Sequence, residues 1–194
     1  MNTQPAVYRT NLEALRNEKP DVVLLDINLP DQNGFALLQQ IKRDPEFALT
    51  PVLALSANAI MALNKGAKIG GFAQDTGEGS ISPHHRRYGG DLIWQIASGY
   101  FGCRNGDGSF SPERFAAQAA DDQVRMIEVK LSQGAKPAHG GILPGQKVSR
   151  EIAETRGIPV GKDCISPAAH SSFSTPLQMM VFLAELRELS GGKP

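Results

Sequence analysis

Apolar residues in the first sixty positions follow the pattern of a strand, a helix and a second strand. The runs DVVLLDINL at 21–29 and PVLALS at 51–56 are continuous, which is typical of strands buried on both faces of a parallel sheet. Between them, FALLQQIKR at 35–43 has helical spacing, and so has YRTNLEALRNE at 8–18, which ends before Pro20. This order predicts two parallel strands joined by a right-handed helical crossover.

Beyond residue 60, short apolar segments alternate with polar loops rich in glycine and proline. In this part we expect helices at 58–66, at 92–98, at 112–120 with Ser111 as N-cap, and at 176–189. We expect strands at 72–75 and 124–131. The change in pattern predicts a domain boundary, with one segment at 1–57 and a second at 58–194.

The composition is that of an ordered globular chain. Of its 194 residues, 41% are hydrophobic and 21% are charged, and the formal net charge is zero. A neutral chain lacks the basic surface that nucleic acid requires, so we expect no nucleic-acid partner. There is no apolar run of about 18 residues and no signal peptide at the N-terminus, so we expect no membrane partner and a cytoplasmic location.

Cysteine and histidine residues give no metal-binding pattern. Cys103 and Cys164 lie far apart without ligand spacing, and we expect both to be free thiols. The adjacent His84 and His85 lack the i, i+4 spacing of metal ligands and are expected on the surface. His170 is either a substrate contact or a loop histidine that makes a structural hydrogen bond, and we favour the structural interpretation by about two to one. No metal site is predicted.

Three places along the chain combine a strand end with reactive or ligand-binding groups. Asp26 ends the first strand, where a carboxylate either accepts a phosphoryl group or merely caps the strand. The turn TGEG at 76–79 has two glycines that let backbone N–H groups approach a ligand, although such a turn is more often structural. Lys130 lies near the end of the strand at 124–131, and is either a ligand-binding cation or a lysine that extends to solvent.

The segment KPDVVLLDINLPDQNGFALLQQIKRDPEFALTPVLALSA resembles the middle of a bacterial response-regulator receiver domain. The resemblance implies that Asp26 is the phosphoacceptor and that Ser56 contacts the phosphoryl group. Receivers also carry an acidic pair that binds Mg²⁺ on an earlier strand and a lysine on a later one, and neither has a counterpart here. Phosphoryl transfer depends on both, so the resemblance implies a degenerate receiver.

From Ser56 onward the chain resembles the FMN-binding barrel domain of glutamate synthase. The resemblance rests on long motifs, which include LSANAIMALNKGAKIGGFAQDTGEGSISPHH, GGDLIWQIASGYFGCRNGDGSFSPERFAAQAA and MIEVKLSQGAKPAHGGILPG. It implies FMN as cofactor, with a lysine that stabilises the negative charge of the reduced flavin. The flavin-binding residues it implies are Ser56, Ala57 and Asn58 under the isoalloxazine ring, Thr76, Gly77, Glu78 and Gly79 beside it, and Lys130 and Gln133. It also implies that Lys136 binds the substrate, 2-oxoglutarate or glutamate.

Together these patterns predict an α/β fold of parallel βα units. A partial (β/α)8-type barrel would follow a fragment of the flavodoxin-like receiver fold, with the fusion in LSANAI at 55–60, which suits both families. The strand at 51–56 would then join the barrel strands in one array. The resemblance stops before the later barrel strands, the flavin phosphate loops and the iron-sulfur cysteines, so we expect an incomplete FMN site and a homo-oligomer that completes the open sheet.

The function implied is that of a glutamate synthase-like, FMN-dependent oxidoreductase domain, truncated and inactive by itself. Two alternatives stay open. One is a degenerate receiver that signals by protein contact. The other is a non-functional product of gene fusion or sequence assembly, or a designed chimera of the two α/β folds.

Overall fold

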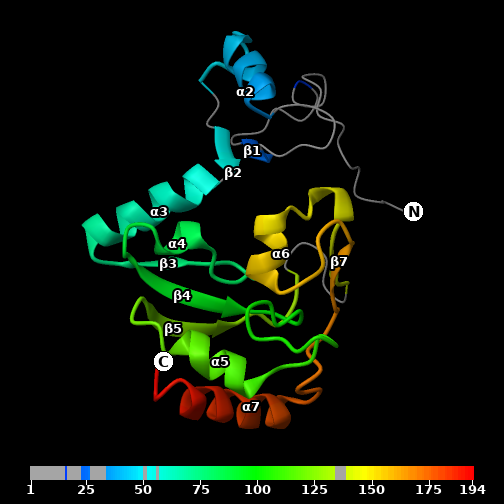
Figure 1. The fold of residues 1–194 in the computed structure, drawn as a ribbon. Coiled ribbons are helices and arrows are strands. Elements are labelled where there is room, and N and C mark those ends of the chain that lie inside the picture. The colour runs from blue at the N-terminus through cyan, green and yellow to red at the C-terminus, as the bar shows by residue number, and fades with distance from the viewer. Residues whose placement is uncertain (1–15, 17–22, 27–33, 50–51, 56, 134–138) are drawn as a thin grey trace. The chain divides into compact units, whose positions relative to one another are not determined.

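A computed structural model describes residues 16, 23–26, 34–49, 52–55, 57–133 and 139–194 (Figure 1). The chain divides into two compact units, Met1–Ala59 and Ile60–Pro194. The division falls near the start of helix α3 (Ala57–Gly70).

The first unit contains the predicted strand, helix and strand. Its elements are β1 (Val23–Asp26), α2 (Gly34–Arg43) and β2 (Val52–Leu55). The two strands pair in parallel, with Val23 beside Val52 and Asp26 beside Leu55. Helix α2 buries Leu37 and Ile41, which are spaced by one helical turn. The parallel pair is therefore confirmed, whereas most of the helix predicted at 8–18 lies outside the described residues.

The second unit is built on three parallel strands in the order β3-β4-β5. These are β3 (Ala73–Asp75), β4 (Asp91–Ile96) and β5 (Val124–Val129). All three run in the same direction (Figure 1), so the loops that follow them emerge at the same edge of the sheet. The strands predicted at 72–75 and 124–131 are confirmed to within two residues.

Helices and a small hairpin-like pair complete this unit. Its helices after α3 are α4 (Pro83–Arg86), α5 (Pro112–Ala119), α6 (Arg150–Arg156) and α7 (Pro176–Leu189). Strands β6 (Gly141–Leu143) and β7 (Cys164–Ser166) pair antiparallel. The hydroxyl of Ser111 accepts a hydrogen bond from Arg114 N–H and so caps α5, as predicted.

The core of this unit lies between the sheet and the helices α5 and α7. The ring of Trp94 stacks on that of Phe115, with 5.3 Å between their centroids. Phe110 and Phe182 meet edge to face at 5.1 Å. Aromatic contacts thus join strand β4 to α5, and the loop residue Phe110 to α7.

The helix predicted at 92–98 is wrong, because this segment forms strand β4. Leu92, Trp94 and Ile96 are buried at every second position, whereas the residues between them are half-buried. That period of two belongs to a strand with one face on a core. Six residues of mixed apolar and polar type were too few to distinguish this period from a helical one.

The predicted single array of strands is also wrong for the described residues. Strands β1 and β2 form a two-stranded sheet of their own, separate from the three-stranded sheet. The structure is therefore α/β with a small parallel sheet of three strands, and closure into a barrel is not seen among the described residues. Within the described part of the chain, no helix combines the length and apolar character needed to cross a membrane.

The Trp94–Phe115 stack makes a quantitative prediction about stability. Phe115 is fully buried, so Phe115→Ala should lower the free energy of unfolding by about 3–5 kcal/mol. Phe72 is 60% exposed, and Phe72→Ala should cost less than about 1 kcal/mol. Urea titration followed by the fluorescence of the single tryptophan would measure both changes. Equal costs for the two variants would contradict this core.

Candidate functional site

The loops after β3, β4 and β5 form one continuous edge, and residues from two of them are in direct contact. The side chain of Glu78, after β3, accepts hydrogen bonds from Lys130 Nζ at 2.7 Å and from Gln133 Nε2 at 2.6 Å. Lys130 Nζ also donates to Gln133 Oε1 at 3.2 Å. Three residues that the sequence separates by up to 55 positions therefore form one polar cluster, which we call the Glu78–Lys130–Gln133 cluster.

The charges in this cluster balance each other. The side chains of Lys130 and Glu78 are 27% and 20% exposed, so their ion pair is partly shielded from water. Burial by itself raises the pKa of the Glu78 carboxyl, but the hydrogen bonds from Lys130 and Gln133 outweigh it. These hydrogen bonds, together with the positive charges of Lys130 and Arg156, hold the pKa of Glu78 below its ordinary value. Glu78 is thus an anion that compensates the lysine.

The turn at 76–79 is held by its own backbone and by strand β4. Gly77 N–H donates to Asp75 Oδ1 at 2.6 Å, and Gln95 N–H donates to Thr76 Oγ1 at 3.1 Å. Gly77 has φ of 67°, a conformation that favours glycine. The turn therefore has one defined shape that places Glu78 over the end of β5.

Carboxyl groups lie beside the cluster on the half-exposed face of the sheet. Gln95 Nε2 donates to Glu128 Oε1 at 2.6 Å. Burial raises the pKa of the Asp75 carboxyl, as does the nearby Glu128, against the lowering effect of the Gly77 N–H group. This face therefore combines acidic groups, one amide and the Lys130 cation within a few residues.

Behind the cluster, His170 connects the ends of β4 and β5. Its Nε2 lies 2.9 Å from the Lys130 carbonyl oxygen, and its Nδ1 lies 3.1 Å from the Tyr100 hydroxyl. Burial lowers the pKa of His170, which favours the neutral ring. Both ring nitrogens are in hydrogen bonds and the residue is buried, so the structural interpretation of His170 is confirmed. Tyr100 and His170 position the backbone that carries Lys130.

The predicted surface position of His85 is wrong. His85 is 4% exposed, and its Nδ1 accepts a hydrogen bond from Ser82 N–H at 3.1 Å. Burial, together with the charges of His84 and Arg86, lowers the pKa of His85 to about 4. The neutral ring also bonds to the backbone of Thr76, so it supports the turn at 76–79. The sequence signal was Ser82 followed by Pro83, a helix start that turns the side chain at the third position inward.

The remaining predicted residues are not all placed. Ser56 and Lys136 lie outside the described residues, and Ala57 and Asn58 are at the start of α3. Cys103 and Cys164 are buried and free. In the ranges that the structure describes, there is no group of three or more His, Cys, Asp or Glu side chains arranged for a metal. Asp26 is the last residue of β1.

The buried neutral state of His85 makes stability depend on pH. The folded pKa of about 4 lies below the ordinary 6.5, so the unfolded chain binds the proton more readily. The contribution of His85 is complete above pH 6.5 and is lost as the pH falls towards 4, by up to about 3 kcal/mol. Unfolding titrations across this range should show a shallower loss for His85→Gln. The exposed His139 provides the control, because His139→Gln should keep the wild-type slope.

Comparison with known proteins covers both units. Residues 21–194 match the sequence profile described as the conserved region in glutamate synthase. A glutamate synthase large subunit-like protein of Bacillus subtilis is 42% identical over 142 residues, which is 73% of this chain and 27% of the relative. An archaeal glutamate synthase of Methanocaldococcus jannaschii is 37% identical over 140 residues, 72% of this chain and 25% of that protein. An archaeal-type glutamate synthase of Thermotoga maritima is 42% identical over 117 residues, 60% and 20% of the two chains.

The chain thus spans about a quarter of the length of these curated relatives. The profile match begins at residue 21 and so includes the segment that resembles a receiver, and these findings lend no support to a receiver fusion. Because the match extends over most of the chain, the protein belongs to the glutamate synthase family, whose conserved region it carries.

Proposed function

We propose that this chain contributes the FMN-binding part of a glutamate synthase-like oxidoreductase that acts on 2-oxoglutarate and glutamate. The observation that carries the proposal is the Glu78–Lys130–Gln133 cluster at the carboxyl edge of parallel strands. Ligands of parallel α/β sheets bind at this edge. We further propose that β3, β4 and β5 are consecutive strands of a (β/α)8-type barrel.

The chemistry of the cluster fits a flavin. Lys130 Nζ has three N–H donors, and two of them are engaged by Glu78 and Gln133 among the described residues. The third is available to an acceptor such as a carbonyl or ring nitrogen of the isoalloxazine. When bound, FMN supplies reversible two-electron chemistry. Lys130 then holds positive charge beside the ring, and Glu78 keeps that charge compensated when the site is free.

The proposal also assigns roles to residues outside the cluster. The turn of Thr76, Gly77 and Gly79 borders the flavin, and Ser56, Ala57 and Asn58 support its ring. Lys136 binds a carboxylate of the substrate. Tyr100 and His170 are positioning residues in this proposal, because His170 contacts the Lys130 carbonyl oxygen and the Tyr100 hydroxyl.

A second copy of the chain is part of the proposal. The sheet has three strands, and its face that carries Asp75 and Glu128 is half-exposed, as is Met126 at 41%. A parallel sheet normally has both faces covered. We propose that another copy, or another part of a larger assembly, covers this face.

Titration with FMN tests the proposed site. At about 100 times its Kd, FMN should stabilise the wild-type chain by roughly 2.7 kcal/mol, visible as a raised thermal midpoint and a perturbed visible flavin spectrum. Lys130→Met removes the charge and its hydrogen bonds, so the Kd should rise by about tenfold or more. The exposed Lys162 gives the matched control, because Lys162→Met should bind as the wild type does.

Two results would oppose the proposal. A wild-type midpoint that FMN leaves unchanged would show that the edge is not a flavin site. Equal affinities for Lys130→Met and Lys162→Met would show that the flavin binds elsewhere.

A degenerate receiver function for residues 1–57 is the second candidate. It is favoured by the position of Asp26, which ends β1 beside the parallel strand β2. Incubation with acetyl phosphate and Mg²⁺, followed by intact-mass measurement, should give no stable adduct if the receiver is degenerate. A phosphoryl adduct in the wild type that is lost in Asp26→Asn would instead establish an active receiver.

A further inference from the structure

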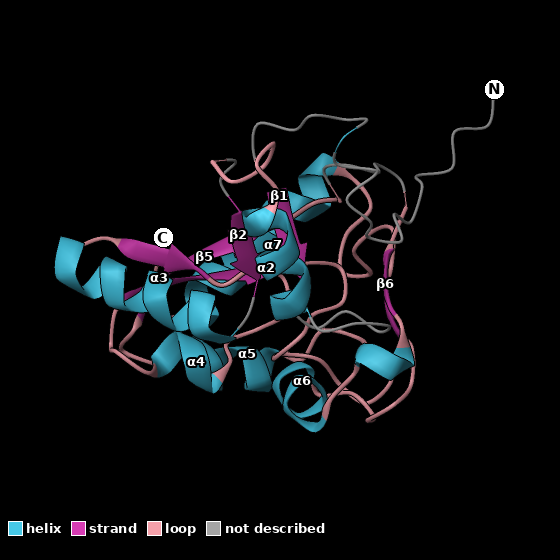
Figure 2. Cartoon of the chain, turned by 90° about the horizontal axis from the view of Figure 1, so that it is seen from above, coloured by secondary structure: helices cyan, strands magenta, loops and turns pink. Residues whose placement is uncertain are grey.

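A cavity of about 320 Å³ is lined by none of the three residues of the Glu78–Lys130–Gln133 cluster. Residues from α4, α5, α6 and the loop after β4 line it. Seen from above, the three helices follow one another along one side of this unit (Figure 2). The volume is within the range of small-molecule sites, roughly 300–1,000 Å³. None of its lining residues has a role in the proposed flavin site except Arg156, whose charge also acts on Glu78.

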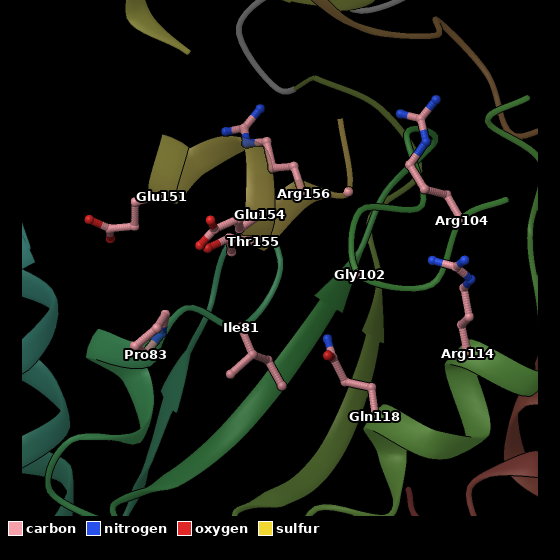
Figure 3. Close-up of a pocket in the computed structure, with 11 residues that line it drawn as sticks. Ile81, Pro83, Gly102, Arg104, Arg114, Gln118, Glu151, Glu154, Thr155 and Arg156 are labelled. Carbon is pink, nitrogen blue, oxygen red and sulfur yellow. The ribbon is translucent and has the colours of Figure 1, made fainter. Parts of the chain in front are cut away.

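Charged side chains of both signs line this cavity. Figure 3 shows Arg104 and Arg114 on one side and Glu151 and Glu154 on the other. Arg114 projects from the same face of α5 as Gln118, four residues later, and Glu154 comes from α6. One side therefore offers two cations, and the α6 side offers two carboxylates together with the guanidinium group of Arg156.

Most of these charged side chains form no ion pair among the described residues. Arg104, Arg114 and Glu154 form no ion pair within the described part of the chain. Glu151 differs, because its carboxylate lies 2.6 Å from His84 Nε2. Arg156 stacks on Phe101 at 4.9 Å and contacts Cys164 Sγ at 3.7 Å, and its charge also acts on the Glu78 carboxylate. The lining thus presents three guanidinium groups and one free carboxylate.

A simple anion would satisfy only part of this lining. Phosphate or a dicarboxylate would pair with the arginines, but it would also face the carboxylate of Glu154 across the cavity. A ligand with two carboxylates and one ammonium group would complement both walls at once. Guanidinium groups bind carboxylates through paired N–H donors, and a glutamate side chain accepts from an ammonium group.

We propose that this cavity is a second ligand site, which binds an acidic α-amino acid. The ligand carboxylates pair with Arg104 and Arg114, and its ammonium group pairs with Glu154. The inference goes beyond the proposed flavin site and does not depend on it. Arg156 connects the two, since it lines the cavity and acts on Glu78, and its guanidinium would lie 3.3 Å from a side chain placed at Gly79.

Calorimetric titration of the full chain with L-glutamate and with glutarate tests this proposal, because glutarate is the same dicarboxylate without the ammonium group. L-glutamate should bind about tenfold more tightly than glutarate, through the additional contact with Glu154. Glu154→Gln should reduce that preference to about twofold or less. Arg114→Gln should weaken both ligands by about tenfold or more. The exposed Arg187 of α7 is the control, and Arg187→Gln should bind as the wild type does.

The result that overturns the proposal is distinct from failure of the flavin site. No binding of L-glutamate, or equal affinity for glutarate, would exclude an amino-acid site in this cavity. Binding that Lys130→Met abolishes and Arg114→Gln preserves would place the amino acid at the flavin edge and would also overturn the proposal. Loss of FMN binding in Lys130→Met with unchanged L-glutamate binding is the pattern expected if both sites exist.

Discussion

Parallel pairing of β3, β4 and β5 is the constraint on which the rest of this structure depends. It brings the ends of strands far apart in the sequence to a single edge, so that Lys130 meets Glu78, 52 residues earlier. The pairing is in turn held by one buried face, where Trp94 stacks on Phe115. A loss of that packing would release the strands and separate the polar groups at their ends.

Two buried histidines, His85 and His170, hold the loops at this edge in place. His85 supports the turn that carries Glu78, and His170 joins the Tyr100 hydroxyl to the Lys130 carbonyl group. Burial favours the uncharged ring in both cases, and an uncharged ring can accept at one nitrogen while donating at the other. The positions of the charged groups at the edge therefore rest on residues that carry no charge.

The two candidate sites differ in how their charges are compensated. At the strand edge, Glu78 and Lys130 neutralise each other, so a ligand has to compete with an existing ion pair. In the cavity between α5 and α6, two arginines and Glu154 have no opposite charge in ion-pair contact within the described residues. Arg156 lies between the sites, and its charge acts on Glu78 as well as on the cavity. A ligand in the cavity would thus alter the electrostatic field at the strand edge that carries Glu78 and Lys130.

The sequence by itself determined the elements whose signals are local. The helix after Ser111 and the helix at 176–189 were predicted from caps and apolar spacing, and the family was indicated by long motifs. Tertiary structure decided the rest. The six residues of β4 fit the period of a helix as well as that of a strand, and pairing with the neighbouring strands decides between the two. Likewise, the burial of His85 and the contact between Glu78 and Lys130 arise from segments that meet only in the folded chain. The residue pattern of a single segment therefore cannot predict them.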